Sequence, residues 1–189
     1  MVSHAAPYLT ARSQAGTSLI EILVTIVILT VGLLGLAGLQ SRTQLAQLDV
    51  FQRSQALILL EDMASRITAN RTSAASYVTV PPLGTGSTCA VTSSSTRQAQ
   101  DACEWSNALL GAAEVSSANN IGAMLGGRGC VSSLGSNKYM VTVAWQGKGP
   151  VSAPPASVPC GQGLYDSATV CVNDLCRRTL TTIVLIGTL

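Results

Sequence analysis

A long apolar run near the N-terminus, from Leu19 to Leu39, constrains the fold of this chain more than any other feature. As a helix, with about 1.5 Å of rise per residue, it would reach roughly 30 Å, the thickness of a bilayer's hydrocarbon core. The run holds one charged residue, Glu21, close to its start. A lone carboxylate in such a segment costs on the order of 3 kcal/mol and usually marks a function. The sequence therefore predicts a membrane-compatible helix that carries one functional acid.

A short polar leader, residues 1–16, precedes this run and contains Arg12 but no acidic residue. An ordinary secretory signal has its cleavage site after the apolar region, yet no A-x-A pattern follows Leu39. The conspicuous small residue, Gly16, stands before the run instead. Cleavage after Gly16 would keep the apolar helix and make Thr17 the first mature residue. The alternative is a plain signal-anchor helix whose Glu21 sits at the headgroup boundary without a partner.

Composition limits the classes of protein that this chain can belong to. With 189 residues it has room for one membrane helix and one modest domain. Eleven basic residues face nine acidic ones, for a net charge of +2, which argues against a broad nucleic-acid footprint. Charged residues make up only 11% of the chain, against roughly 25% in a typical soluble protein. Such a surface suits a subunit packed among others.

The cysteines predict an oxidising compartment. There are six, all after the apolar run, and an even number on one side of a membrane helix reads as disulfides in the periplasm: Cys89, Cys103, Cys130, Cys160, Cys171 and Cys176. Their spacing leaves the pairing open; Cys171 and Cys176 suit a turn closed by its own bridge or two bridges that diverge. A zinc site is disfavoured, because the chain has no C-x-x-C and its one histidine, His4, is in the leader. Basic residues flank both ends of the run, so we let the cysteines set the orientation, with the leader cytoplasmic.

The predicted helix continues beyond the membrane, because no Pro or Gly interrupts residues 40–70. We expect one helix over residues 17–70, about 80 Å long at 1.5 Å per residue, with a membrane half at 17–40 and an amphipathic half at 41–71. One apolar stripe recurs at helical spacing, with a single polar interruption: Leu45, Leu48, Gln52, Ala56, Leu60, Met63 and Ile67. The acidic pair Glu61-Asp62 reads as a solvated face. Gly32, Gly35 and Gly38 either permit close helix approach or are ordinary membrane-helix glycines.

Residues 72–189 predict a periplasmic sheet domain with disulfide-tied loops. The clearest strand is Tyr139 to Gln146, and further strands are expected at 168–172 and at 177–187, the last of which is rich in β-branched residues. A short helix is expected over 101–110, and the glycines at 126–129 predict a turn that leads Cys130 into a strand. Trp105 and Trp145 read as core residues. The predicted fold class is α+β, with a long N-terminal helix packed on a small antiparallel sheet.

No catalytic constellation is visible. After the leader the chain has no histidine, the commonest general base and metal ligand, and its acids are scattered. The glycine-rich stretch at 126–129 lacks the Lys-Ser/Thr of a phosphate loop. We therefore expect neither an enzyme nor a bound cofactor or metal.

The order Gly16, Ser18-Leu19-Ile20-Glu21, apolar run resembles the class III signal of type IV pilins and pseudopilins, although Thr17 stands where Phe is usual. Further segments are similar to minor pilins of the PilV group: Gly32 to Gln40, Leu59 to Arg71, Asp101 to Trp105, Val141 to Gly147 and the strand that starts at Arg177-Arg178. The resemblance implies a pilin-like fold. It also implies cleavage between Gly16 and Thr17 by a prepilin peptidase, with methylation of the new N-terminus. Glu21 would pair with the N-terminal ammonium of an adjacent subunit.

The resemblance further implies what the protein does and where it does it. A chain of this family would sit in the inner membrane with a single span and later enter the pilus. There it would help to prime pilus assembly and would support twitching motility and surface adhesion. Its partners would be other minor pilins and the major pilin, through their N-terminal helices, and the inner-membrane assembly machinery. The alternatives are a type II secretion pseudopilin, or an adhesin or DNA-uptake protein anchored by the same helix.

Overall fold

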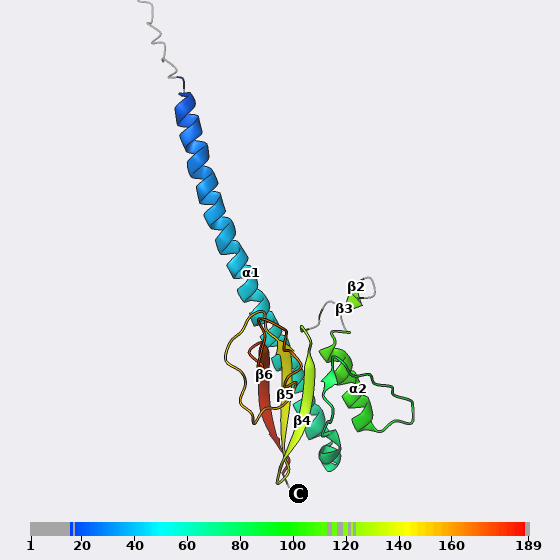
Figure 1. The fold of residues 1–189 in the computed structure, drawn as a ribbon. Helices are drawn as coiled ribbons and strands as arrows, with labels where there is room; N and C mark the ends of the chain where they lie inside the picture. Colours follow the sequence, from blue (N-terminus) through cyan, green and yellow to red (C-terminus); the bar gives the residue numbers. More distant parts are fainter. Residues whose placement is uncertain are drawn as a thin grey trace, which may run out of the picture. The chain divides into compact units, whose positions relative to one another are not determined.

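The structure is a computed structural model that describes residues 16, 18–112, 115–116, 119–120, 122 and 124–187. The chain divides into two compact units, Met1–Leu45 and Ala46–Leu189. A single helix contributes to both units, and the sheet lies entirely in the second (Figure 1). The α+β class predicted from the sequence is therefore confirmed.

Helix α1 spans Leu19–Ala69, 51 residues, and confirms the long N-terminal helix. Its first turn forms on the carbonyl of Ser18, which accepts the backbone N–H groups of Glu21 at 2.9 Å and Ile22 at 3.2 Å. A 3₁₀ helix, η1 (Arg71–Tyr77), follows directly and was not expected from the sequence. The predicted first helical residue, Thr17, lies outside the described residues.

Only part of the predicted apolar stripe of α1 is buried. Ala56, Leu60, Met63 and Ile67 are buried as expected, and Leu59 joins them. Leu45 and Leu48, however, are 50% and 45% exposed, so the stripe was drawn too far toward the N-terminus. The reason is that no other described part of the chain packs on α1 before Gln52. Gln52 is the first residue of the stripe that is half-buried.

The second unit contains a four-stranded antiparallel sheet in the order β1-β4-β5-β6. These strands are Leu83–Gly84, Arg128–Gly135, Lys138–Gln146 and Arg177–Leu185. A separate two-residue pair joins β2 (Val115–Ser116) to β3 (Asn119–Asn120). Strands β5 and β6 confirm the two clearest predictions, and β4 starts in the glycine turn that was expected to precede Cys130.

The strand predicted at residues 168–172 is wrong. That segment folds back on itself, because the Ser167 N–H donates to the Cys171 carbonyl at 2.6 Å and the Cys171 N–H donates to the Ser167 hydroxyl at 3.1 Å. Its β-branched residues therefore lie in a local turn, and Val170 is 58% exposed. Local propensity alone did not reveal the competing turn.

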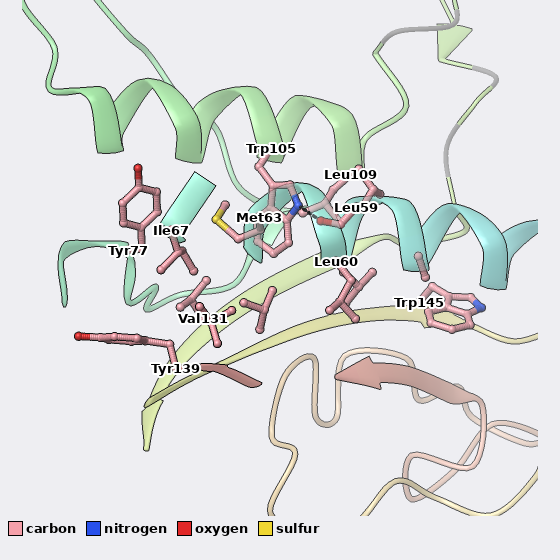
Figure 2. Close-up of a cluster of buried hydrophobic side chains, with 14 of the residues drawn as sticks. Leu59, Leu60, Met63, Ile67, Tyr77, Trp105, Leu109, Val131, Tyr139 and Trp145 are labelled. Atoms are coloured by element: carbon pink, nitrogen blue, oxygen red, sulfur yellow. Dashed lines mark hydrogen bonds between the residues drawn. The ribbon is translucent and has the colours of Figure 1, made fainter. Parts of the chain in front are cut away.

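One hydrophobic core joins the C-terminal part of α1 to the sheet and to helix α2 (Arg97–Leu109), which confirms the predicted short helix (Figure 2). Thr96 caps α2 by accepting the Ala99 N–H at 3.2 Å. Trp105 is fully buried, and its indole N–H donates to the Leu59 carbonyl of α1 at 2.8 Å. Trp145 is buried as well, so both tryptophans are core residues as expected.

All six cysteines form disulfides, as predicted: Cys89–Cys103, Cys130–Cys160 and Cys171–Cys176. The first ties the serine-rich loop to α2, and the second ties the long loop after β5 to strand β4. The third closes a short turn in which Asn173 and Asp174 adopt left-handed conformations, with φ of 54° and 62°. Asn and Asp tolerate that region better than other side chains, which suits a turn closed by its own bridge.

A buried arginine anchors the loop between β5 and β6, residues 147–176. The side chain of Arg177 is 1% exposed, donates to the carbonyls of Val158 at 2.7 Å and Cys160 at 3.1 Å, and pairs with Asp174 at 3.2 Å. Tyr165 adds a second anchor, since its hydroxyl donates to the Gly126 carbonyl at 2.9 Å and the Arg128 guanidinium lies 4.9 Å from its ring. The loop thus covers one end of the sheet face that points away from α1.

The contact between α2 and β4 yields a stability prediction. A Cβ added at Gly129 would overlap the Trp105 ring and lie 2.7 Å from a Leu109 methyl group. Gly129→Ala should therefore lower the free energy of unfolding by about 1–3 kcal/mol through overpacking. Gly149→Ala is the matched control, because a Cβ there meets nothing within 4 Å. Urea titrations followed by tryptophan fluorescence should separate the two variants; equal midpoints would contradict this packing.

Candidate functional site

The first candidate site is the exposed apolar segment of α1, which we define as Leu19–Leu39. Every residue in it is exposed, and large side chains such as Leu33 and Leu34 are 66% and 73% exposed. By length and composition α1 is able to cross a membrane. An exposed apolar surface of this extent needs lipid or other protein chains to cover it, because water-exposed apolar patches on soluble monomers are much smaller. The segment therefore fits a membrane anchor or a signal sequence.

The threonine hydroxyl groups of the apolar segment donate hydrogen bonds to carbonyls of the same helix. Thr25 donates to the Ile22 carbonyl and Thr30 to the Val27 carbonyl, each at 2.8 Å. A hydroxyl that bonds the preceding turn of its own helix leaves no free donor to face hydrocarbon. Backbone groups are likewise bonded within the helix, the condition that lipid imposes on a spanning segment.

Glu21 is the one charged side chain of the apolar segment, and it lies in the first turn of α1. There the free N–H groups and the helix dipole favour a negative charge. It is exposed, and no ion pair to it exists within the part of the chain that the structure describes. Gly16 is exposed too, whereas Thr17 lies outside the described residues. The carboxylate is therefore placed where a partner cation from outside the chain can reach it.

Three glycines open the apolar segment to close approach. A Cβ built at Gly32, Gly35 or Gly38 would meet nothing within 4 Å. Because they recur every three residues, the three glycines lie on one side of α1. The helix backbone is exposed on that side. A second helix can approach such a surface more closely than one lined by leucine. This geometry is compatible with both interpretations given above for the glycines.

The second candidate site is a charge cluster that the sequence did not predict, which we call the Arg66 cluster. It joins α1, η1 and α2 and consists of Asp62, Arg66, Tyr77, Arg97, Asp101 and Glu104. Arg66 donates to Asp62 at 3.0 Å, Asp101 at 3.0 Å and Glu104 at 2.6 Å. The Asp101 carboxylate is 2% exposed, forms an ion pair with Arg97 at 3.1 Å and accepts a hydrogen bond from the Tyr77 hydroxyl at 2.5 Å. An open pocket of about 370 Å³ adjoins Arg66, Arg97 and Asp101.

The interactions within the Arg66 cluster shift two pKa values. Burial of the Arg66 guanidinium lowers its pKa, but the bonds to Glu104, Asp62 and Asp101 outweigh this and raise it overall. Burial, followed by the hydrogen bond to Asp101, raises the pKa of Tyr77. The solvated face expected for Glu61-Asp62 therefore holds only for Glu61, which is exposed, whereas Asp62 is half-buried and pairs with Arg66. The pairs Asp62/Arg66 and Arg97/Asp101, each four residues apart, were the only sequence signal, and neither indicates its partner helix.

Among the other described residues we find no free thiol and no metal-binding group. The cysteines are all in disulfides, so they present no thiols. Within the same residues no group of three or more His, Cys, Asp or Glu side chains is placed to hold a metal ion. The Arg66 cluster therefore holds α1, η1 and α2 together. The apolar segment is the surface that needs lipid or another protein chain to cover it.

Comparisons with known proteins give no match: no family model, no curated protein and no solved structure is similar to this chain.

The Arg66 cluster predicts an alkaline loss of stability. Because the Tyr77 pKa is raised above its usual value of 10.0, the folded chain keeps a proton that the unfolded chain releases at high pH. The free energy of unfolding should be at its full value below about pH 10 and fall as pH rises above it. Tyr77→Phe should cost about 1–2 kcal/mol at neutral pH, because Asp101 loses a donor, and should make the alkaline loss smaller. The loss persists in part, since burial also raises the pKa of Tyr165.

Denaturation midpoints of the full chain in detergent, compared near neutral pH and above pH 10, measure both effects. Tyr139→Phe is the control, because the Tyr139 hydroxyl makes no hydrogen bond to any described residue. A Tyr77→Phe variant with an alkaline loss as large as that of the unmodified chain would contradict the assignment.

Proposed function

We propose that this chain is a minor pilin of a type IV pilus, similar to the PilV group. The observation that supports this most is the division of a single helix. Its N-terminal part is apolar and exposed from Leu19 to Leu39, while its C-terminal part buries one face in a disulfide-tied sheet domain, through Ala56, Leu59, Leu60, Met63 and Ile67. A subunit that moves from a membrane to a fibre needs an apolar helix in both places and a folded domain outside them.

The proposed maturation step is cleavage between Gly16 and Thr17 by a prepilin peptidase. Two features support it: a small residue directly before the apolar helix, and the carboxylate of Glu21 in the first helical turn. Cleavage there leaves the whole helix on the mature chain. The chain then resides in the inner membrane with residues 72–189 in the periplasm, where an oxidising environment permits its three disulfides.

In the proposed assembly step, Glu21 pairs with the N-terminal ammonium of an adjacent subunit. An isolated carboxylate in hydrocarbon is costly, and so is an isolated ammonium. Pairing them removes two exposed charges together and fixes the axial register of two neighbouring helices. The free carboxylate and the open glycine side of α1 supply the charge and the close approach that such packing requires.

Beyond these steps, the proposed role is that of a non-catalytic subunit that primes pilus assembly with other minor pilins. The major pilin and the inner-membrane assembly machinery are its further partners. Through the pilus it supports twitching motility and surface adhesion. The low charge content of the chain, 11%, supports a subunit that is packed among others.

Processing is tested at the residue before the cut. Gly16→Leu should block maturation, because a branched side chain next to the scissile bond obstructs the peptidase's access to the backbone. The unprocessed chain should still insert in the membrane. Intact-mass measurement of the membrane-bound protein should give a mature chain that starts at Thr17 for the unmodified sequence and the full precursor for the variant. A mature N-terminus at any other residue would show that the cut is misplaced.

Assembly is tested at Glu21, the acid in the first turn of α1. Glu21→Gln should leave membrane insertion and cleavage intact but reduce the amount of this chain in sheared surface pili at least about tenfold, the effect of losing one desolvated ion pair. Asp49→Asn is the control, because Asp49 is an exposed carboxylate on the same helix, beyond the apolar segment. Normal incorporation of the Glu21 variant would contradict the pairing. Loss of exoprotein secretion with normal pili would instead favour a secretion pseudopilin.

A further inference from the structure

The two edges of the sheet are protected to very different degrees. Edge strand β1 has only two residues, Leu83–Gly84, and follows two prolines, Pro81 and Pro82. Short strands and prolines are the usual devices that stop an edge from pairing with another chain. The opposite edge strand, β6, has nine residues and carries no proline, and no charge between Thr179 and Leu185. The β1 edge therefore carries devices against further pairing, and the β6 edge lacks them.

The register shows which backbone groups β6 presents outward. Just outside the ladder, the Ile186 N–H donates to the Asn137 carbonyl at 2.9 Å and the Gly147 N–H donates to the Cys176 carbonyl at 2.8 Å. Both contacts continue the register in which Val184 faces Tyr139 and Thr182 faces Val141. Even-numbered residues of β6 therefore bond to β5, and odd-numbered ones point their N–H and C=O groups away from it.

We call these outward groups the β6 edge: Thr179, Thr181, Ile183 and Leu185. Among the described residues no hydrogen bond outside the sheet reaches their backbone atoms. The loop of residues 147–176 contacts the beginning of β6 through Arg178, which donates to the Gly149 carbonyl at 2.7 Å. From Thr179 onward the edge offers a continuous row of donors and acceptors.

A groove runs beside this edge on the side of the sheet that faces α1. It has a volume of about 400 Å³ and is lined by residues of α1 and by Thr182 to Leu185: Glu61, Ala64, Ser65 and Thr68 are the α1 members. Three of these four side chains are small, so the groove has room for the side chains of an added strand. Glu61 is its one charged lining residue, and no ion pair to Glu61 exists within the described residues.

The other face of the sheet is apolar next to the same edge. Ile183 and Leu185 are 62% and 64% exposed, and Ile183 lies opposite the half-buried Met140 of β5. At the far end of this face, the loop of residues 147–176 covers the sheet through a small cluster around Cys130, Ala144 and Tyr165. The loop thus leaves the apolar row of Met140 and Ile183 uncovered where it meets the β6 edge.

We propose that the β6 edge binds an extended segment of a different protein chain, which adds to the sheet as a further strand. Its backbone pairs with the outward groups of Thr179 to Leu185. One of its faces is apolar and extends the row of Met140 and Ile183. The other face carries small side chains and a Lys or Arg, which enters the groove and pairs with Glu61. This mode of binding takes affinity from main-chain hydrogen bonds and specificity from alternate side chains.

A second copy of this chain fits the edge less well. The open part of its own β6, Thr179 to Leu185, carries no basic residue and so offers no cation to Glu61. The charge of the groove thus favours a different partner. This docking site rests on the second unit alone and is independent of the proposed role in a pilus.

The test uses the full chain, isotopically labelled and disulfide-bonded, in detergent micelles. The probe is a synthetic peptide that alternates Val and Thr, with one Lys on the Thr face. Its matched control is the same peptide N-methylated at the amides on one backbone edge, in two versions, one for each edge. On adding the unmodified peptide, amide hydrogen exchange at Thr181 and Ile183 should slow at least about tenfold, and one N-methylated version should have no effect.

Two variants of one residue separate the backbone from the side chain. Thr181→Pro removes one outward N–H without removing a bond to β5, so it should preserve the fold and weaken peptide binding at least about tenfold. Thr181→Ala keeps that N–H and should bind the peptide normally. Glu61→Gln should weaken the Lys-containing peptide but not a version with Thr in place of Lys.

Several outcomes would overturn the proposal. They are slow exchange at the β6 edge in the free chain, no slowing with the peptide, and equal effects of the unmodified peptide and both N-methylated versions. Protection that rises with the concentration of this chain alone would assign the edge to a second copy instead. Should Thr181→Pro fail to fold, the N-methylated peptides still decide the question, because they leave the protein unchanged.

Discussion

The contrast between the two parts of helix α1 is the constraint on which the rest of the structure depends. Burial of apolar area gains roughly 25 cal/mol per Å², and the C-terminal part of the helix gains it within its own chain, through Leu60, Met63 and Ile67. From Leu19 to Leu39 the same helix gains nothing of this kind from the described residues. It can bury its apolar area only in lipid or against other helices. Membrane insertion and helix packing would both provide that burial.

The second unit has to be rigid enough to hold its end of the helix, although much of it is loop. Hydrophobic packing explains only part of this, because the segments at 85–96 and 147–176 contain no strand or helix. Two disulfides and the buried Arg177 fix those loops, and the Arg66 cluster joins α1 to α2 and η1. Such staples are typical of small domains whose cores are too limited to order long loops by themselves. The sheet edge at β6, in contrast, has no such contact from Thr179 onward within the described residues.

The features that could be predicted from the sequence are those with a local signal. Helical periodicity predicted α1, alternation predicted β5, and the β-branched run predicted β6. The strand expected at 168–172 failed because Ser167 and Cys171 close a turn that propensity does not reveal. The pairings Cys89–Cys103 and Cys130–Cys160 and the meeting of Arg66 with Asp101 have no local signal, since they depend on tertiary contacts. The short spacing of Cys171 and Cys176, in contrast, already allowed the bridge that they form. Gly16 and Glu21 were identified by residue order alone, and the structure adds that Glu21 is exposed in the first turn.

The central claim is that the apolar segment of α1 stays on the mature chain and is covered by lipid. Alkaline carbonate extraction of membranes, followed by intact-mass measurement of this chain in each fraction, tests it most directly. We expect the chain to remain in the membrane pellet, to dissolve only in detergent, and to have the mass of a chain that starts at Thr17. Recovery of a soluble chain that lacks Leu19 to Leu39 would contradict the claim, because the domain would then function without its helix.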